Sequence, residues 1–80
     1  MILLTKHAQE AVNVRGIAFA WIEEAISSPD FVEADPRHPE RTRSYKAIAA
    51  FGRRMLLVVH RPEGDDIVII TVHFDRGARR

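Results

Sequence analysis

Residues 55–70, MLLVVHRPEGDDIVII, contain two runs of aliphatic side chains that are separated by a polar segment. The runs at 55–59 and 67–70 consist of leucine, methionine and β-branched residues, which is typical of the central strands of a sheet. The segment 62–66 between them contains Pro62 and Gly64 and predicts a five-residue hairpin loop. An antiparallel pair of strands is therefore expected at the centre of the fold.

Three weaker strands are expected before this hairpin. Residues 31–35 alternate between apolar and polar side chains, and residues 2–4 predict a short first strand. Residues 36–42, with two prolines, are expected to form a polar loop. A strand is predicted over residues 45–51, with one face formed by Tyr45, Ala47, Ala49 and Phe51 and the other by Lys46, Ile48 and Ala50.

Two amphipathic helices are predicted between the first strand and the others. The first covers residues 6–15, with Thr5 as its N-cap and Gly16 in the left-handed position after its end. The second covers residues 17–28 and ends before Pro29, because the residue ahead of a proline disfavours helical backbone. Both helices are too short to be stable alone, so they must pack on an apolar surface.

The predicted order of elements is (β)ααββββ, which defines an α+β fold with two N-terminal helices on a small, mainly antiparallel sheet. With 80 residues, positions 1–80 are expected to form one domain. The helices are expected to cover one face of the sheet. The other face of an antiparallel sheet can meet water, and a functional site can be built there.

The composition excludes several classes of protein. The absence of cysteine excludes disulfide scaffolds, thiolate zinc sites, iron–sulfur clusters and cysteine nucleophiles. The apolar runs are too short for a membrane span, so we expect a soluble, cytoplasmic protein without a membrane partner. Residues 1–35 carry two cations and six acids (net −4), whereas residues 36–80 carry ten cations and five acids (net +5). This asymmetry indicates either a polyanionic or acidic partner for the C-terminal half, or simply solvated strand edges.

Three of the four histidines, His7, His60 and His73, stand at the ends of predicted elements. They could form a three-histidine metal site, but they lack a recognised ligand spacing, and the alternative is that each is an ordinary hydrogen-bonded side chain. No metal or other cofactor is therefore predicted. Counting alternate positions places His60 on the face of Leu56 and Val58, and His73 on the face of Ile67, Ile69 and Thr71. No serine nucleophile elbow and no phosphate-binding glycine loop is present in the sequence.

The segment 41–46, RTRSYK, combines cations with an aromatic ring at the start of a strand. Cations neutralise phosphates, and a ring can stack on an unpaired base. Metal-free RNA cleavage needs a base, an acid and cations for the charge on the reacting phosphate. The residue types required are present at Arg43, Tyr45, Lys46, Arg61 and His73. The alternative is a solvated strand edge whose cations discourage aggregation.

A family resemblance rests on short motifs in a fixed order: 5–8 (TKHA), 15–17 (RGI), 43–45 (RSY) and 70–75 (ITVHFD). In these motifs the chain resembles a group of small prokaryotic domains of unknown function. That group is similar to an outlying branch of the RelE/ParE toxin superfamily, and the C-terminal motif also resembles BrnT toxins. The resemblance implies a ribonuclease or related toxin that pairs with an antitoxin protein.

The resemblance also implies roles for individual residues. It implies that catalysis depends on Arg43, Tyr45, Lys46 and Arg61, and from the residue types alone His73 or His60 is expected to carry the proton. Binding of RNA is expected at Arg41, His60 and Arg61. His7 and Arg15 belong to the pattern of the unknown-function group; they are candidate binding residues, and the alternative is that they tie the first helix to the loop and sheet. For BrnT-like activity the nearest acidic counterpart is Glu40, beside Arg43.

Three hypotheses follow from these observations. The first is a metal-independent endoribonuclease that binds RNA on the open sheet face. The second is a non-catalytic interaction module, a degenerate toxin or regulatory partner, that uses the same surface for a protein, with a homodimer as one of the assemblies considered. The third is a histidine metal enzyme.

Overall fold

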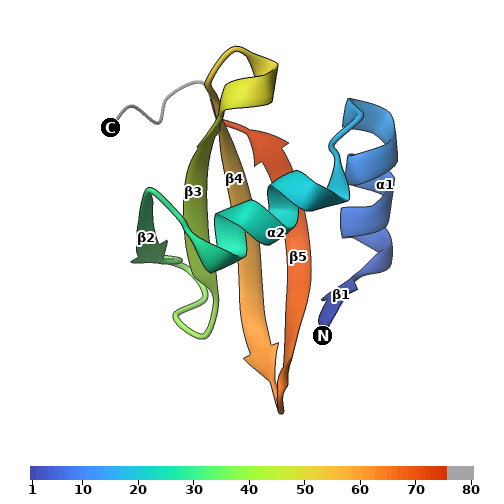
Figure 1. The fold of residues 1–80 in the computed structure, drawn as a ribbon. Coiled ribbons are helices and arrows are strands. Elements are labelled where there is room, and N and C mark those ends of the chain that lie inside the picture. The colour runs from blue at the N-terminus through green and yellow to red at the C-terminus, as the bar shows by residue number, and fades with distance from the viewer. Residues whose placement is uncertain (76–80) are drawn as a thin grey trace.

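The order of elements in the computed structural model, which describes residues 1–75, is a strand, two helices and four strands (Figure 1). The predicted α+β class and element order are confirmed. The strands join into one sheet in the order β1-β5-β4-β3-β2, in which β1 runs parallel to β5 and the other pairs are antiparallel. The helices are α1 (Lys6–Arg15) and α2 (Phe19–Ser27), and the strands are β1 (Ile2–Leu4), β2 (Phe31–Ala34), β3 (Thr42–Ile48), β4 (Arg54–Glu63) and β5 (Asp66–Phe74).

Helix α1 has the predicted bounds because both of its ends are capped as expected. The hydroxyl of Thr5 accepts a hydrogen bond of 3.1 Å from the backbone N–H of Ala8. Gly16 follows the helix with a φ of 64°, and its N–H bonds to the carbonyl of Val12. These two caps satisfy backbone groups that would otherwise lack partners at the helix ends.

Helix α2 is shorter than the predicted 17–28. Ile17 is buried in the core at 4% exposure, and Ala18 has extended backbone and makes no side-chain cap. The chain is therefore extended where the side chain of Ile17 enters the core, and the helix begins only at Phe19.

The predicted strand 45–51 has different bounds in the structure. β3 begins at Thr42 and ends at Ile48, and Ala49–Phe51 form a 3-10 turn. Gly52 and Arg53 both have positive φ, at 64° and 60°, and reverse the chain toward β4. Phe51 accordingly leaves the sheet, and its ring lies 5.7 Å from that of Trp21.

The predicted five-residue hairpin loop is also shorter in the structure. β4 and β5 continue to Glu63 and Asp66, which pair with each other and leave only Gly64 and Asp65 in the turn. The φ of 63° at Gly64 allows this two-residue connection, because such hairpin turns need positive φ.

A β-bulge at Ile70 changes the face on which the end of β5 presents its side chains. Val59 pairs with Thr71 whereas the next residue, His60, pairs with Ile69, so that Ile70 has no partner on β4. Strict alternation placed His73 on the face of Ile69, and this prediction is wrong. The extra residue turns Thr71 and His73 to the opposite face.

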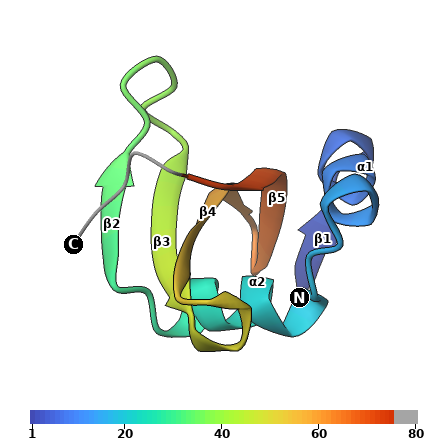
Figure 2. The ribbon, with the colours of Figure 1, turned by 90° about the horizontal axis from the view of Figure 1, so that it is seen from above.

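The two helices occupy different positions relative to the sheet. α2 lies against β3 and β4, and α1 lies beside β5 next to β1 (Figure 2). Between α2, α1 and the sheet lies the main core, formed by Ala8, Ile17, Ile22, Ala25, Ile48, Leu56, Val58, Ile69 and Val72. Neither helix has the length and apolar character needed to cross a membrane.

The centre of the side opposite α2 carries no helix among the described residues, and α1 lies at its β5–β1 edge rather than on the same face as α2, in contrast to the expectation that both helices cover one face (Figure 2). This centre is not bare, however. Tyr45, Leu57 and Val59 form a second apolar cluster there, each at no more than 6% exposure. Neighbouring side chains therefore shield the centre of this face.

Candidate functional site

The side of the sheet opposite α2 is called the helix-free face here, and it is crossed by two neighbouring rows of paired residues. One row contains Phe31, Tyr45, Leu57 and His73, and the other contains Glu33, Arg43, Val59 and Thr71. Adjacent strands are about 4.8 Å apart, so the backbones of Tyr45 and His73 are about 10 Å apart. The structure thus places the predicted residues Arg43, Tyr45 and His73 on one face.

Arg43 is held between two carboxylates. Its Nε donates a hydrogen bond of 3.3 Å to Asp35 Oδ2, and its Nη1 lies 3.5 Å from Glu33 Oε2. The other oxygen of Asp35 accepts the backbone N–H groups of Arg37 and His38. The Arg37 N–H above all, followed by the His38 N–H and Arg43, lowers the pKa of Asp35 against the opposing effect of burial. Asp35 therefore stays ionised and orients Arg43.

Tyr45 is a buried hydrogen-bond donor. Its hydroxyl donates to Glu33 Oε2 at 2.8 Å, and its ring stacks on Phe31 with the centroids 4.2 Å apart. Burial, followed by the bond to Glu33, raises the pKa of Tyr45 above its usual value of 10.0. At 4% exposure the ring offers little surface to an RNA base, in contrast to the expectation from the sequence.

His73 lies within the electrostatic reach of two arginines. Burial lowers the pKa of His73 below 6.5; Asp75 opposes this effect, and Arg15 and Arg43 add to it. Within residues 1–75 the imidazole makes no side-chain hydrogen bond. His73 is therefore a mainly neutral imidazole near pH 7, able to accept a proton from a bound group.

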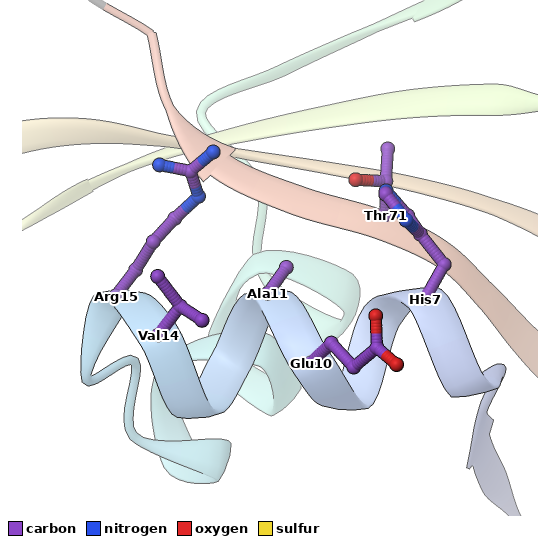
Figure 3. A pocket seen from close by; sticks show the side chains of 6 residues that line it. All are labelled: His7, Glu10, Ala11, Val14, Arg15 and Thr71. Carbon is purple, nitrogen blue, oxygen red and sulfur yellow. The ribbon is translucent and has the colours of Figure 1, made fainter.

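A hollow of about 170 Å³ lies between α1 and β5 at the edge of this face. Figure 3 shows His7 beside Thr71, and Arg15 reaching from the end of α1 toward β5. The lining residues are His7, Glu10, Ala11, Val14, Arg15 and Thr71. The predicted binding residues His7 and Arg15 are thus brought to the border of the helix-free face.

Lys46 and His60 project from the other side of the sheet, toward α2, because they alternate with Tyr45 and Val59. Lys46 Nζ lies 3.7 Å from Asp30 Oδ1. His60 Nε2 lies 2.7 Å from the hydroxyl of the buried Ser44, and burial lowers the pKa of His60. The sheet therefore separates Lys46 and His60 from His73.

Arg41 and Arg61 lie farther along the strands, beyond the row that contains Arg43. Arg61 Nη1 pairs with Glu63 Oε1 at 2.9 Å, and Arg41 Nε lies 3.8 Å from Glu40 Oε2. The proposed counterpart Glu40 thus pairs with Arg41, whereas Arg43 is paired with Glu33 and Asp35.

The three histidines considered as metal ligands are not brought together. His60 faces α2, whereas His73 lies on the helix-free face and His7 lies on α1 at its edge. Residues 1–75 contain no group of three or more histidine or acidic side chains arranged to hold a metal ion.

Two carboxylates that position Arg43 and Tyr45 were not among the residues predicted from the sequence. Glu33 and Asp35 occupy alternate positions before a loop, and Arg43 and Tyr45 occupy alternate positions after it. Pairing of these strands as a hairpin places Glu33 directly opposite Arg43. This complementary spacing of acids and cations in the sequence could have predicted the contact between Glu33 and Arg43.

The helix-free face therefore combines a mainly neutral imidazole with Arg43, which two carboxylates hold in place, and with Arg15 at its edge, while the phenol of Tyr45 donates to Glu33. Such a set can bind an anion and accept a proton from a hydroxyl next to it. Fold and face together define a small α+β domain with a polar site on the exposed side of an antiparallel sheet.

The chain belongs to the family described as "Domain of unknown function (DUF4258)", whose model matches residues 4–74. No curated protein matches the chain, and no solved structure does. The predicted membership in a group of small domains of unknown function is confirmed, and the resemblance to RelE, ParE and BrnT toxins stays a prediction.

Proposed function

We propose that this domain is a metal-independent endoribonuclease, the toxin of a toxin–antitoxin pair, and that it cleaves RNA on the helix-free face. The observation that carries the proposal is that His73, Arg43 and Tyr45 share the helix-free face, with Arg15 of α1 at its edge. A proton acceptor and cations on one face are the groups that cleavage of a phosphodiester next to a ribose hydroxyl requires.

In the proposed reaction, His73 accepts the proton of a ribose 2′-hydroxyl. The 2′-oxygen attacks the neighbouring phosphorus, and the bond from phosphorus to the 5′-oxygen breaks. Water supplies the proton to the departing oxygen. The products are a 2′,3′-cyclic phosphate and a 5′-hydroxyl, and Arg15 and Arg43 offset the charge that accumulates on the phosphate oxygens.

The other polar groups of the face act as positioning residues in this proposal. Asp35 orients Arg43 through the 3.3 Å hydrogen bond. Tyr45 donates to Glu33 and so fixes the carboxylate that lies against Arg43. The guanidinium of Arg43 is thereby oriented before substrate binds, which reduces the entropic cost of ordering this side chain on binding.

The experiment is induction of the chain alone in cells, followed by mapping of RNA 5′ ends. The proposal expects growth arrest and new 5′ ends with the wild-type chain, and neither with His73→Gln at equal protein abundance. Normal growth without new ends would contradict it.

A second candidate function, a non-catalytic module that binds a protein partner such as an antitoxin, is favoured by a different observation. Arg41, Arg43 and Arg61 each have a carboxylate within 4 Å. A surface of paired charges is suited to a protein with complementary charges rather than to a polyanion.

Co-purification with the product of a neighbouring gene tests this candidate. A stable complex without RNA cleavage, weakened by Arg43→Ala and Tyr45→Ala, would support it. An unchanged affinity in both variants would rule out this surface, and size-exclusion chromatography of the chain alone would reveal whether the partner is a second copy.

A further inference from the structure

A second hollow, of about 260 Å³, lies at the end of the sheet next to the C-terminal end of α1. It is lined by Arg15, Phe51, Arg54 and Phe74. Arg15 also lines the hollow beside Thr71, which lies two residues before His73 on β5. Arg15 therefore connects this second hollow to the candidate catalytic face.

Arg54 is held in place by aromatic rings. Its guanidinium carbon lies 5.2 Å from the ring centroids of both Phe51 and Phe74, and these rings lie 4.9 Å apart. Trp21 packs against both phenylalanines, with centroids 5.7 and 6.2 Å away. A guanidinium stacked on rings loses little freedom when it binds a ligand and keeps its N–H donors available.

The two arginines of this hollow have no carboxylate partner among residues 1–75. None of its lining residues is acidic, and within residues 1–75 neither Arg15 nor Arg54 forms an ion pair. Arg43 and Arg61, by contrast, are paired with carboxylates. Two unpaired guanidinium groups around one hollow form a site for an anion with several acceptor oxygens.

We propose that this hollow binds a phosphate group of single-stranded RNA. This phosphate lies on the same strand as the phosphate that is cleaved at His73, either before or after it. The inference rests on the proposed function, because Arg15 would contact the same RNA strand on its way to the catalytic face. The planar donors of Arg15 and Arg54 fit the oxygens of a phosphodiester, and the aromatic rings behind Arg54 exclude water from one side.

The test is binding of a fluorescently labelled, single-stranded 2′-O-methyl oligonucleotide, measured by anisotropy over a range of salt concentrations. This probe has no 2′-hydroxyl and cannot be cleaved, so binding is measured separately from catalysis. The variants are Arg15→Gln and Arg54→Gln. The matched control is Arg37→Gln, which removes the same charge from an exposed loop arginine without an ion pair in the described chain.

The proposal expects each of the two variants to weaken binding about 3- to 10-fold and to reduce the slope of log affinity against log salt by about 0.7, the value for one lost phosphate contact. Arg37→Gln should change neither quantity. Arg54→Lys keeps the charge but loses the planar group and should fall between wild type and Arg54→Gln. Circular dichroism melting verifies that each variant is folded.

Three results would overturn the proposal: no binding by the wild type, equal losses in Arg37→Gln and Arg54→Gln, or binding of inorganic phosphate that depends on Arg54 while binding of the oligonucleotide does not. The last would identify free phosphate as the ligand. If RNA is not cleaved but binding depends on Arg54, the nuclease proposal fails and the phosphate site stands. If RNA is cleaved but binding is independent of Arg54, the phosphate-site proposal fails and the nuclease proposal stands.

Discussion

Tyr45 on β3 and His73 on β5 both pair in register with Leu57 on β4, so their side chains lie on the same face with one strand between them. This relationship depends on the bulge at Ile70. Without the extra residue, His73 would point toward α2 and would be separated from Arg43. The bulge is therefore the backbone feature that assembles the candidate site.

Arg43→Lys tests whether the geometry of the guanidinium matters in addition to its charge. Lysine keeps the positive charge but cannot reach Asp35 and Glu33 together as Arg43 does. RNA cleavage is expected to fall about 100-fold because the cation is displaced from its position. Arg37→Lys is the control and should retain full activity; equal activity of the two variants would remove Arg43 from the mechanism.

The pH dependence of cleavage follows from the lowered pKa of His73. Burial is the main cause of that lowering, and a base must be neutral to accept a proton. The cleavage rate is therefore expected to rise with pH and to reach its plateau with a midpoint below 6.5. Initial rates measured at constant ionic strength provide the profile, and a midpoint above neutrality would contradict the assignment of His73 as base.

Tyr45→Phe separates the hydroxyl of Tyr45 from its ring. The ring keeps its stacking on Phe31, whereas the 2.8 Å hydrogen bond to Glu33 is lost. The free energy of unfolding is expected to fall by about 0.5–1.5 kcal/mol. Urea denaturation measures the change, and the double variant with Glu33→Gln should lose less than the sum of the two single variants, because both substitutions affect the same bond. An unchanged free energy of unfolding in Tyr45→Phe would mean that this hydrogen bond contributes nothing to stability.

The stability of the fold should decrease in mild acid because of His60. Burial lowers the pKa of His60 below 6.5, so between that lowered value and 6.5 the unfolded chain binds more protons than the folded protein. The free energy of unfolding is therefore expected to be greatest near and above neutral pH and to fall as the pH drops through this interval. His73 contributes in the same direction.

His60→Gln should flatten this dependence relative to the wild type. Urea denaturation at several pH values between mildly acidic and neutral gives the two slopes. If the free energy of unfolding had the same slope against pH in the wild type and in His60→Gln, His60 would not be the cause of the pH dependence.

Local signals were sufficient to predict much of the fold. Thr5 and Gly16 defined α1 because helix caps are read from neighbouring residues alone. The aliphatic runs around Leu57 and Ile69 located β4 and β5 but not their full lengths, because the paired ends at Glu63 and Asp66 are polar. Where Phe51 leaves the sheet depends on its contact with Trp21, which is distant in sequence.

The site was harder to predict than the fold. The face of His73 depends on a single bulge residue, Ile70, that has no sequence signal of its own. The pairing of Glu33 with Arg43 depends on the register of β2 and β3 across the loop. Residue types alone could therefore suggest Arg43 and His73 as candidates but could not show which groups hold them.

The most direct test of the central claim is incubation of purified protein with RNA in the presence of a metal chelator, followed by analysis of the new ends. The account predicts fragments with 2′,3′-cyclic phosphate and 5′-hydroxyl ends, and a rate about 100- to 10,000-fold lower for a folded His73→Gln variant. Intact RNA with the wild-type protein, or equal cleavage by His73→Gln, would contradict it.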